Sequence, residues 1–169
     1  MNLLDLQPKT TFAPVPNFKP ANAEVALVGE AGGKEEARLK MPMVGDTGYN
    51  IRKFSTAGSI QFERCARLNL FPVHPPDNEL GHCLELGKHP KLMPGFENAV
   101  ELLHEELKSL PKLKVVVAMG NAATWALTGR QEITKWRGSP LYSDRLGCYV
   151  IPTIHPSPKT VNRDWYIRY

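Results

Sequence analysis

Apolar residues in this chain gather in short runs that alternate with polar, periodic segments. Runs without regular polar positions are typical of strands buried on both faces of a sheet. They cover residues 24–28, 114–120 and 148–155, and a fourth apolar stretch lies at 66–71. Gly29 directly follows the first run, so we expect that strand to end there in a tight turn.

The segments between these runs predict helices. In residues 96–109, Val100, Leu103 and Leu107 share one face, and charged side chains occupy the other. Residues 121–129 predict a second helix that is ended by its glycine.

Two weaker helical signals lie nearer the N-terminus. Asp46 or Thr47 could cap a helix that runs to about Ala57. The glycine-rich segment at 29–33 opens into either a helix or a charged loop.

Strands that alternate with helices predict a parallel sheet covered on both faces. We therefore expect an α/β fold, a three-layer α/β/α sandwich with a small central parallel sheet. A chain of 169 residues suits one domain with one core. Residues 1–22 carry four prolines and predict an extended N-terminal arm, which leaves the domain itself at residues 23–169.

Composition narrows the class of protein only a little. Hydrophobic residues make up 42% and charged residues 22%, a balance typical of soluble globular proteins rather than disordered ones. Lys and Arg outnumber Asp and Glu by 21 to 17, which is compatible with a polyanionic partner but does not establish one.

Three cysteines with no C-x-x-C spacing argue against a disulfide framework. The N-terminus lacks a signal-peptide pattern, and the apolar runs are too short to span a bilayer. We expect a cytoplasmic monomer that does not bind membranes.

Four polar or glycine-rich segments follow the expected strands. They are Gly29–Lys34, Asn69, Gly120-Asn121 and His155–Pro158. Ligands of open parallel sheets bind beyond the carboxyl ends of the strands, so these segments could converge on one crevice. Neither the Walker A loop nor the G-x-G-x-x-G motif is present, which counts against a nucleotide-binding or nucleotide-hydrolysing protein.

Taken in order, several motifs resemble the uracil-DNA glycosylase superfamily, and most closely its family 4 and phage-type members. The motifs run from about residue 24 to residue 163, and they are GEAGG, PMVG, LNLFPVHPPDN, VVVAMGNAA, WRG and PTIHPSP. The resemblance implies an enzyme that binds uracil-containing DNA, flips the uracil out of the helix and hydrolyses its N-glycosidic bond.

The resemblance also assigns roles to residues. Glu30 would orient the attacking water, and His155 would donate a hydrogen bond to uracil O2. Asn69 would read the pyrimidine edge, because an amide both donates and accepts. Further contacts to the base would come from Gly29, Ala31, Gly32 and Met43, and contacts to DNA from Lys135, Arg137, Ser157 and Lys159.

The chain departs from the superfamily pattern at four places. Met43 replaces an aromatic residue that stacks on the flipped base. Lys159 replaces a leucine that fills the gap left in the DNA helix by the flipped base. Gly32 replaces a proline, which we expect to loosen the loop. Family 4 enzymes hold an iron–sulfur cluster on four cysteines, and here Val73 stands where one ligand is expected. We therefore predict no cluster and no other cofactor.

Two other readings remain open. A zinc site from His74, His82, Cys83 and His89 is conceivable, but the irregular spacing favours ordinary loop residues. The chain could also be a catalytically weak or inactive DNA-binding module that is fused or bound to a DNA polymerase. Met43 and Lys159 favour such a module, whereas the presence of Glu30, Asn69 and His155 favours an active enzyme. If the protein is viral, we expect it in the cytoplasm of the host cell.

Overall fold

The fold centres on one five-stranded sheet. The computed structural model describes residues 13–75, 84–85, 91–92 and 97–161. The sheet has the order β3-β2-β7-β9-β8, which places β2 and β7 next to each other in the middle. The strands are β2 (Val25–Ala31), β3 (Ala66–Phe71), β7 (Val115–Met119), β8 (Leu141–Ser143) and β9 (Cys148–Thr153).

The sheet is mixed rather than entirely parallel. The first four strands in this order are parallel, as the apolar runs predicted, but β8 pairs antiparallel with β9 at the edge. A short turn joins the two strands, and Gly147 in that turn has a φ of 67°. Because β8 has only three residues, it leaves no apolar run by which the sequence could reveal it.

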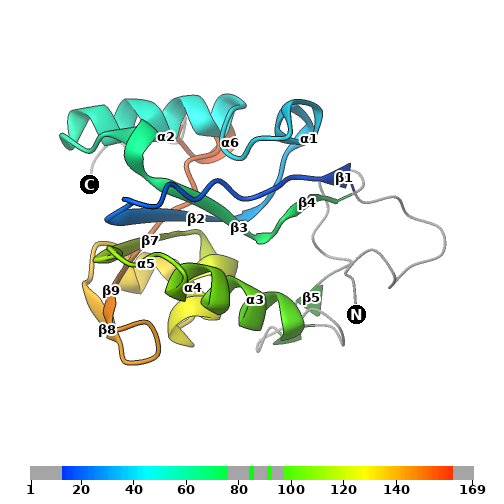
Figure 1. Ribbon diagram of the computed structural model, residues 1–169. Helices are drawn as coiled ribbons and strands as arrows, with labels where there is room; N and C mark the ends of the chain where they lie inside the picture. The colour runs from blue at the N-terminus through cyan, green and yellow to red at the C-terminus, as the bar shows by residue number, and fades with distance from the viewer. Residues whose placement is uncertain (1–12, 76–83, 86–90, 93–96, 162–169) are drawn as a thin grey trace.

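Helices cover both faces of the sheet and complete the three-layer α/β/α sandwich (Figure 1). One layer holds α1 (Lys34–Leu39), α2 (Asp46–Ala57) and α6 (Pro158–Val161), and the other holds α3 (Glu97–Lys108), α4 (Asn121–Thr128) and the short α5 (Ile133–Trp136). Smaller elements are the 3-10 turn η2 (Phe62–Arg64) and the strands β1 (Ala13–Pro14), β4 (Val73–His74), β5 (Leu84–Glu85) and β6 (Lys91–Leu92).

Two expected element boundaries were wrong. Strand β2 continues through the glycine that was expected to end it, because Gly29 and Ala31 still pair with Asn69 and Phe71 of β3. Neither Asp46 nor Thr47 caps α2; its N-cap is the preceding glycine, without a side-chain hydrogen bond.

The main core lies between the sheet and the layer of α3 and α4. Three buried alanines of α4, Ala122, Ala123 and Ala126, keep the helix close to the strands, and Leu103 and Leu107 of α3 fill the space beside it. Because β3, β2 and β7 pair in parallel, this packing holds their carboxyl ends at the same edge of the sheet. None of the described helices has both the length and the apolar character needed to cross a bilayer.

The described part of the N-terminal arm covers an edge of the sheet. β1 pairs antiparallel with β4, and Phe18 forms an isolated antiparallel bridge with Arg67 of β3. Val15 between them has no exposed surface, and its N–H donates to the Pro72 carbonyl at 2.8 Å. The arm thus occupies backbone groups that an edge strand would otherwise expose.

Candidate active site

A pocket of about 690 Å³ opens at the carboxyl ends of the parallel strands. Its lining combines the first glycine-rich segment, the loop before α2, the end of β3 and the segment after β9. Residues in this lining include Gly29, Glu30, Ala31, Gly32, Gly33, Glu36, Met43, Asn69, Met119, His155, Ser157 and Lys159. Three of the four segments predicted to converge therefore line one pocket, and the fourth, Gly120-Asn121, is not part of its lining.

Glu30 and His155 come together over Gly120. A Cβ atom placed on Gly120 would lie 3.7 Å from Glu30 Oε2 and 3.4 Å from His155 Cβ. Gly120 has a φ of 90°, which favours glycine, and it begins α4 directly after β7. The missing side chain thus leaves room for a carboxylate and an imidazole to share one space. Asn121, in contrast, does not line the pocket, and its side chain accepts the Ile133 N–H.

Burial shifts both of these groups toward their neutral forms. It raises the pKa of Glu30, and no charge or hydrogen bond among the described residues offsets this effect. Burial also lowers the pKa of His155, while the negative charge of Glu36 acts in the opposite direction. At neutral pH the imidazole is therefore uncharged and retains one N–H to donate.

Asn69 approaches the pocket because Gly29 has no side chain. The two residues are paired neighbours on β3 and β2. A Cβ on Gly29 would lie only 2.6 Å from Asn69 Oδ1, which is inside contact distance. The side chain of Asn69 is buried, yet it lines the pocket. Gly29 is therefore required to admit this amide.

Gly32 tightens its loop, contrary to the expected loosening. Its N–H donates to the Val73 carbonyl at 2.9 Å, and its carbonyl lies 3.1 Å from His74 Nδ1. Val15 of the arm fills the space where a Cβ on Gly32 would be, at 2.4 Å. A proline would lose the N–H and meet Val15, so the arm and the glycine fit each other.

Met43 closes another side of the pocket in an unusual backbone conformation. Its φ is 59°, which costs a residue with a Cβ on the order of 1 kcal/mol. Its carbonyl would clash with any Cβ on Gly48 of α2, at 2.0 Å. The buried side chain packs with Ile51 and Met119, and its Cε would lie 3.7 Å from a Cβ on Gly29.

A model of the uracil DNA glycosylase superfamily matches residues 15–168 of this chain. The chain belongs to the uracil DNA glycosylase superfamily. No curated protein matched the chain. Membership supports a glycosylase-type activity on DNA, and it agrees with the observed α/β fold and its mixed five-stranded sheet.

Three supporting residues of this superfamily member were not found from its sequence. Asn17 accepts the Asn69 N–H through Oδ1 at 3.0 Å, and its amide also donates to Glu106. Asn50 of α2 donates to the Pro156 carbonyl at 3.0 Å and so holds the segment that carries His155. Glu36 is the third, and it is buried in the pocket wall. No local pattern marks the asparagines, because their partners lie 52 and 106 residues away.

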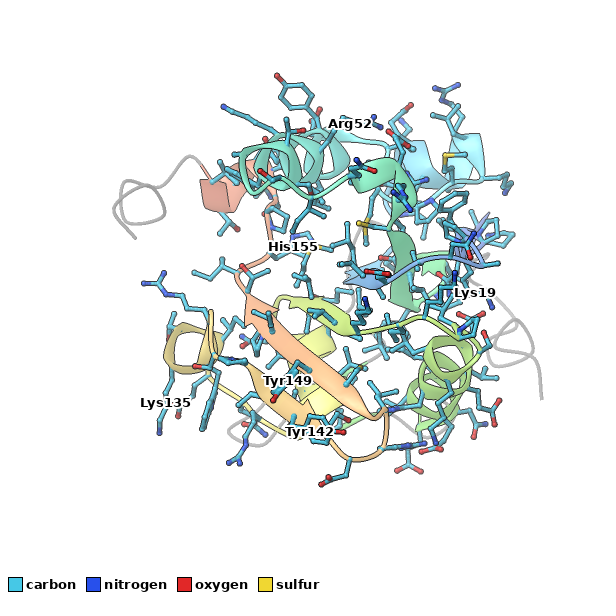
Figure 2. The ribbon with its side chains drawn as sticks, turned by 60° about the vertical axis from the view of Figure 1, so that its left-hand side comes forward. Lys19, Arg52, Lys135, Tyr142, Tyr149 and His155 are labelled. Carbon is cyan, nitrogen blue, oxygen red and sulfur yellow. The ribbon has the colours of Figure 1, made fainter. Side chains whose placement is uncertain are left out.

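The residues expected to contact DNA fall into two groups. Ser157 and Lys159 line the pocket, and Ser157 Oγ lies 2.8 Å from Thr160 Oγ1 at the start of α6. Lys135 and Arg137 do not line it. Lys135 Nζ lies 5.9 Å from the centre of the Trp136 ring, and in Figure 2 its side chain extends outward, away from His155.

Metal binding has no support in the described part of the chain. No group of three or more potential ligands occurs there. His74 of the conceivable zinc site contacts Gly32, and the other three residues of that site, 82, 83 and 89, lie outside the described residues.

Proposed function

We propose that this chain is a uracil-DNA glycosylase that extrudes uracil from DNA and hydrolyses its N-glycosidic bond. One observation carries the proposal: a carboxylate and a neutral imidazole, both partly buried, meet over Gly120 in a pocket at the strand ends. The pocket is concave and large enough to receive a single base, as base-binding pockets are.

Glu30 serves the sugar side of the reaction. As the bond between C1′ and the base breaks, positive charge grows on the sugar, and a nearby carboxylate stabilises it. The same carboxylate orients the water whose oxygen bonds to C1′ and accepts a proton from it. Since burial raises the pKa of Glu30, the group is prepared to hold that proton.

His155 serves the base side. The electron pair of the broken bond moves into the uracil ring, and negative charge gathers on O2. A neutral imidazole can donate one N–H to that oxygen without moving a proton first. The lowered pKa of His155 keeps the imidazole in this form.

Asn69 and Met43 hold the base between these groups. The amide of Asn69 can donate to uracil O4 and accept from N3–H, a pattern that cytosine does not offer. The thioether of Met43 can cover the ring face, less rigidly than an aromatic side chain would. Lys159 and Ser157 at the rim fit a phosphate of the DNA strand.

An oligonucleotide with one uracil, incubated with the protein and then with alkali, tests this function. We expect strand scission at the uracil, and we expect Glu30→Ala and His155→Ala to lower its rate by at least about 100-fold. Glu24→Ala, at the opposite end of β2, is the matched control and should retain the wild-type rate. If the wild-type protein leaves the DNA intact, the glycosylase function is wrong, and the alternative of a DNA-binding module without catalysis is favoured.

A further inference from the structure

Glu36 is a buried acid in the pocket wall that the reaction above does not use. It is the third residue of α1, and most of its surface is covered. Its carboxylate lies between two glycines that belong to different segments. A Cβ on Gly33 would lie 2.5 Å from Oε2, and a Cβ on Gly45 would lie 3.6 Å from both carboxylate oxygens.

The carboxylate therefore joins the two loops that form the pocket. Gly33 ends the glycine-rich segment that carries Glu30, and Gly45 ends the loop that carries Met43. The Gly45 N–H donates to Glu36 Oε1 at 3.4 Å, a long hydrogen bond. This bond helps to hold a loop whose Met43 occupies a left-handed conformation that other contacts must maintain.

We propose that Glu36 is a positioning residue of this site, which fixes the Met43 loop against the glycine-rich segment and places a negative charge within reach of His155. The proposal rests on the proposed function for its catalytic meaning only. The two structural effects, that Glu36 holds the Met43 loop and that its charge acts on the His155 imidazole, apply equally to the protein without DNA.

The electrostatic part agrees with the surroundings of His155. Charged groups that face the pocket come from β2 (Glu30), α1 (Lys34, Glu35, Glu36), α2 (Asp46) and α6 (Lys159). Among these described groups, Glu36 has the one resolved charge effect on His155, and it raises the pKa that burial lowers. Removal of this charge should therefore lower the pKa of His155 further.

A simpler role predicts different results. An acid at the third position of a helix often bonds back to the residue before the helix and stabilises its first turn. Such a role involves Gly33 alone. It would change the stability of α1 but neither the loop at Gly45 nor the titration of His155.

Two measurements on the protein without DNA separate these roles. The first is an NMR titration of the His155 ring, and the second is hydrogen exchange of the Gly45 amide. For Glu36→Gln we expect the His155 pKa to fall, because the negative charge that raises it is lost, and the Gly45 amide to exchange about tenfold faster. Glu35→Gln removes a charge one residue earlier, where the carboxylate bonds to Arg38, and should change both quantities much less.

Glu36→Asp keeps the charge but shortens the side chain. It should leave the His155 titration close to that of the wild type and still speed exchange at Gly45, and it serves if Glu36→Gln folds poorly. In an active enzyme, the acid limb of the pH–rate profile should move to lower pH in Glu36→Gln by the same shift. An unchanged His155 titration in folded Glu36→Gln, or an unchanged Gly45 exchange in folded Glu36→Gln or Glu36→Asp, would overturn the proposal. Absence of scission by the wild type would overturn only the glycosylase function.

Discussion

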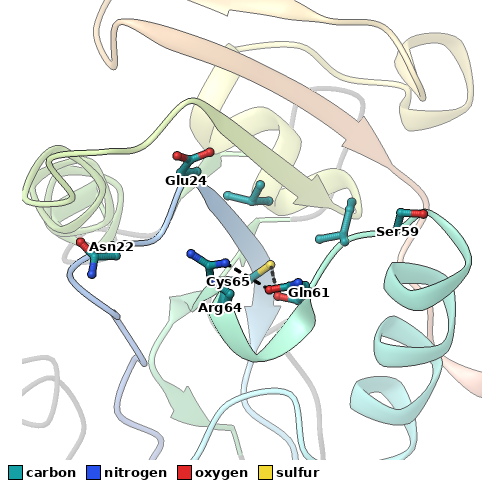
Figure 3. Close-up of a pocket in the computed structure, with 8 residues that line it drawn as sticks. Asn22, Glu24, Ser59, Gln61, Arg64 and Cys65 are labelled. Atoms are coloured by element: carbon teal, nitrogen blue, oxygen red, sulfur yellow. Dashed lines mark hydrogen bonds between the residues drawn. The ribbon is translucent and has the colours of Figure 1, made fainter.

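The two ends of the central sheet both carry a hollow lined by polar side chains, but the ends differ in how far those side chains have charged or hydrogen-bonding partners. The hollow at the amino ends, of about 400 Å³, includes Glu24, Gln61, Arg64 and Cys65 (Figure 3). There these four side chains have partners: Lys114 Nζ lies 3.1 Å from Glu24, Arg64 donates to Gln61 Oε1 at 3.3 Å, and Cys65 Sγ lies 3.5 Å from the Gln61 carbonyl.

At the carboxyl ends, the effect of burial on the key groups outweighs that of their neighbours. Burial shifts the pKa of both Glu30 and His155 toward the neutral form. The backbone of Met43 is strained, and Gly29 and Gly120 omit side chains that would fill the space. Ionisable groups that burial holds in the neutral form are typical of sites that bind a ligand, and Glu30 and His155 both line one pocket.

The amino end also has a left-handed residue, Ser59, and a thiol, Cys65, whose pKa is raised by burial. The two ends therefore differ in whether their charged groups are paired, and not in backbone strain or burial alone.

The largest loss of activity that tests this contrast is expected from a side chain added at Gly29. Gly29→Ala places a Cβ 2.6 Å from Asn69 Oδ1 and must displace that amide. We expect kcat/KM for uracil excision to fall by about 100-fold, because displacement of a base-reading group by a fraction of an ångström to 1 Å has effects of this size.

Gly58→Ala is the matched control at the other end of the molecule. Its nearest neighbour would be the Phe54 carbonyl at 3.5 Å, an ordinary contact. Excision kinetics of both variants, with circular dichroism to check folding, decide the question. Equal activity of the two variants would show that Asn69 does not need its observed position.

A smaller effect is expected from the support of Asn69. Asn17→Ala removes the acceptor of the Asn69 N–H, and a lost hydrogen bond of about 1 kcal/mol corresponds to about fivefold in kcat/KM. Asn17 also donates to Glu106, and Lys19 Nζ lies 3.3 Å from the same carboxylate. Lys19→Ala therefore disturbs Glu106 but leaves the hydrogen bond between Asn17 and Asn69 in place. If Lys19→Ala is as impaired as Asn17→Ala, the effect comes from Glu106 and not from Asn69.

The melting temperature should respond differently to the loss of Glu30 at the carboxyl end and of Glu24 at the amino end. The raised pKa of Glu30 means that the folded chain keeps this proton to a higher pH than the unfolded chain does, so the carboxylate reduces stability as pH rises above about 4.5. Glu30→Gln should therefore raise Tm by about 2–4 °C at pH 7.5, equivalent to about 1 kcal/mol. The gain should vanish below about pH 4.

Glu24→Gln provides the comparison for that melting experiment. The carboxylate of Glu24 is more than half exposed and pairs with Lys114, so its loss should move Tm by less than about 1 °C. A drop in Tm for Glu30→Gln at neutral pH would mean that the carboxylate has a stabilising partner after all.

The smallest effect concerns DNA binding at the pocket rim. Lys159→Ala should weaken binding of an uncleaved oligonucleotide by about threefold at low salt and reduce the slope of log K against log salt by about one. Lys114→Ala, at the amino end, should leave the slope unchanged. A slope near zero for the wild type would contradict phosphate contacts altogether.

Local patterns in the sequence predicted the longer helices and the parallel strands, and the motif resemblance predicted much of the pocket lining. The periodicity of residues 96–109 and the apolar run 114–120 predicted α3 and β7 to within one residue at each end. Such patterns depend on neighbours a few positions away, which the sequence displays directly. The motif resemblance supplied Glu30, Asn69 and His155, all of which the structure brings to one pocket.

How these parts fit together became visible in the folded chain. The fold placed Val15 of the arm against Gly32, Asn17 beside Asn69, and Glu36 between Gly33 and Gly45. It also added the antiparallel strand β8 and gave Met43 its left-handed backbone. These features depend on contacts between segments far apart in the chain, or on a backbone that the surrounding packing holds in an unfavourable conformation, and no local pattern encodes either one.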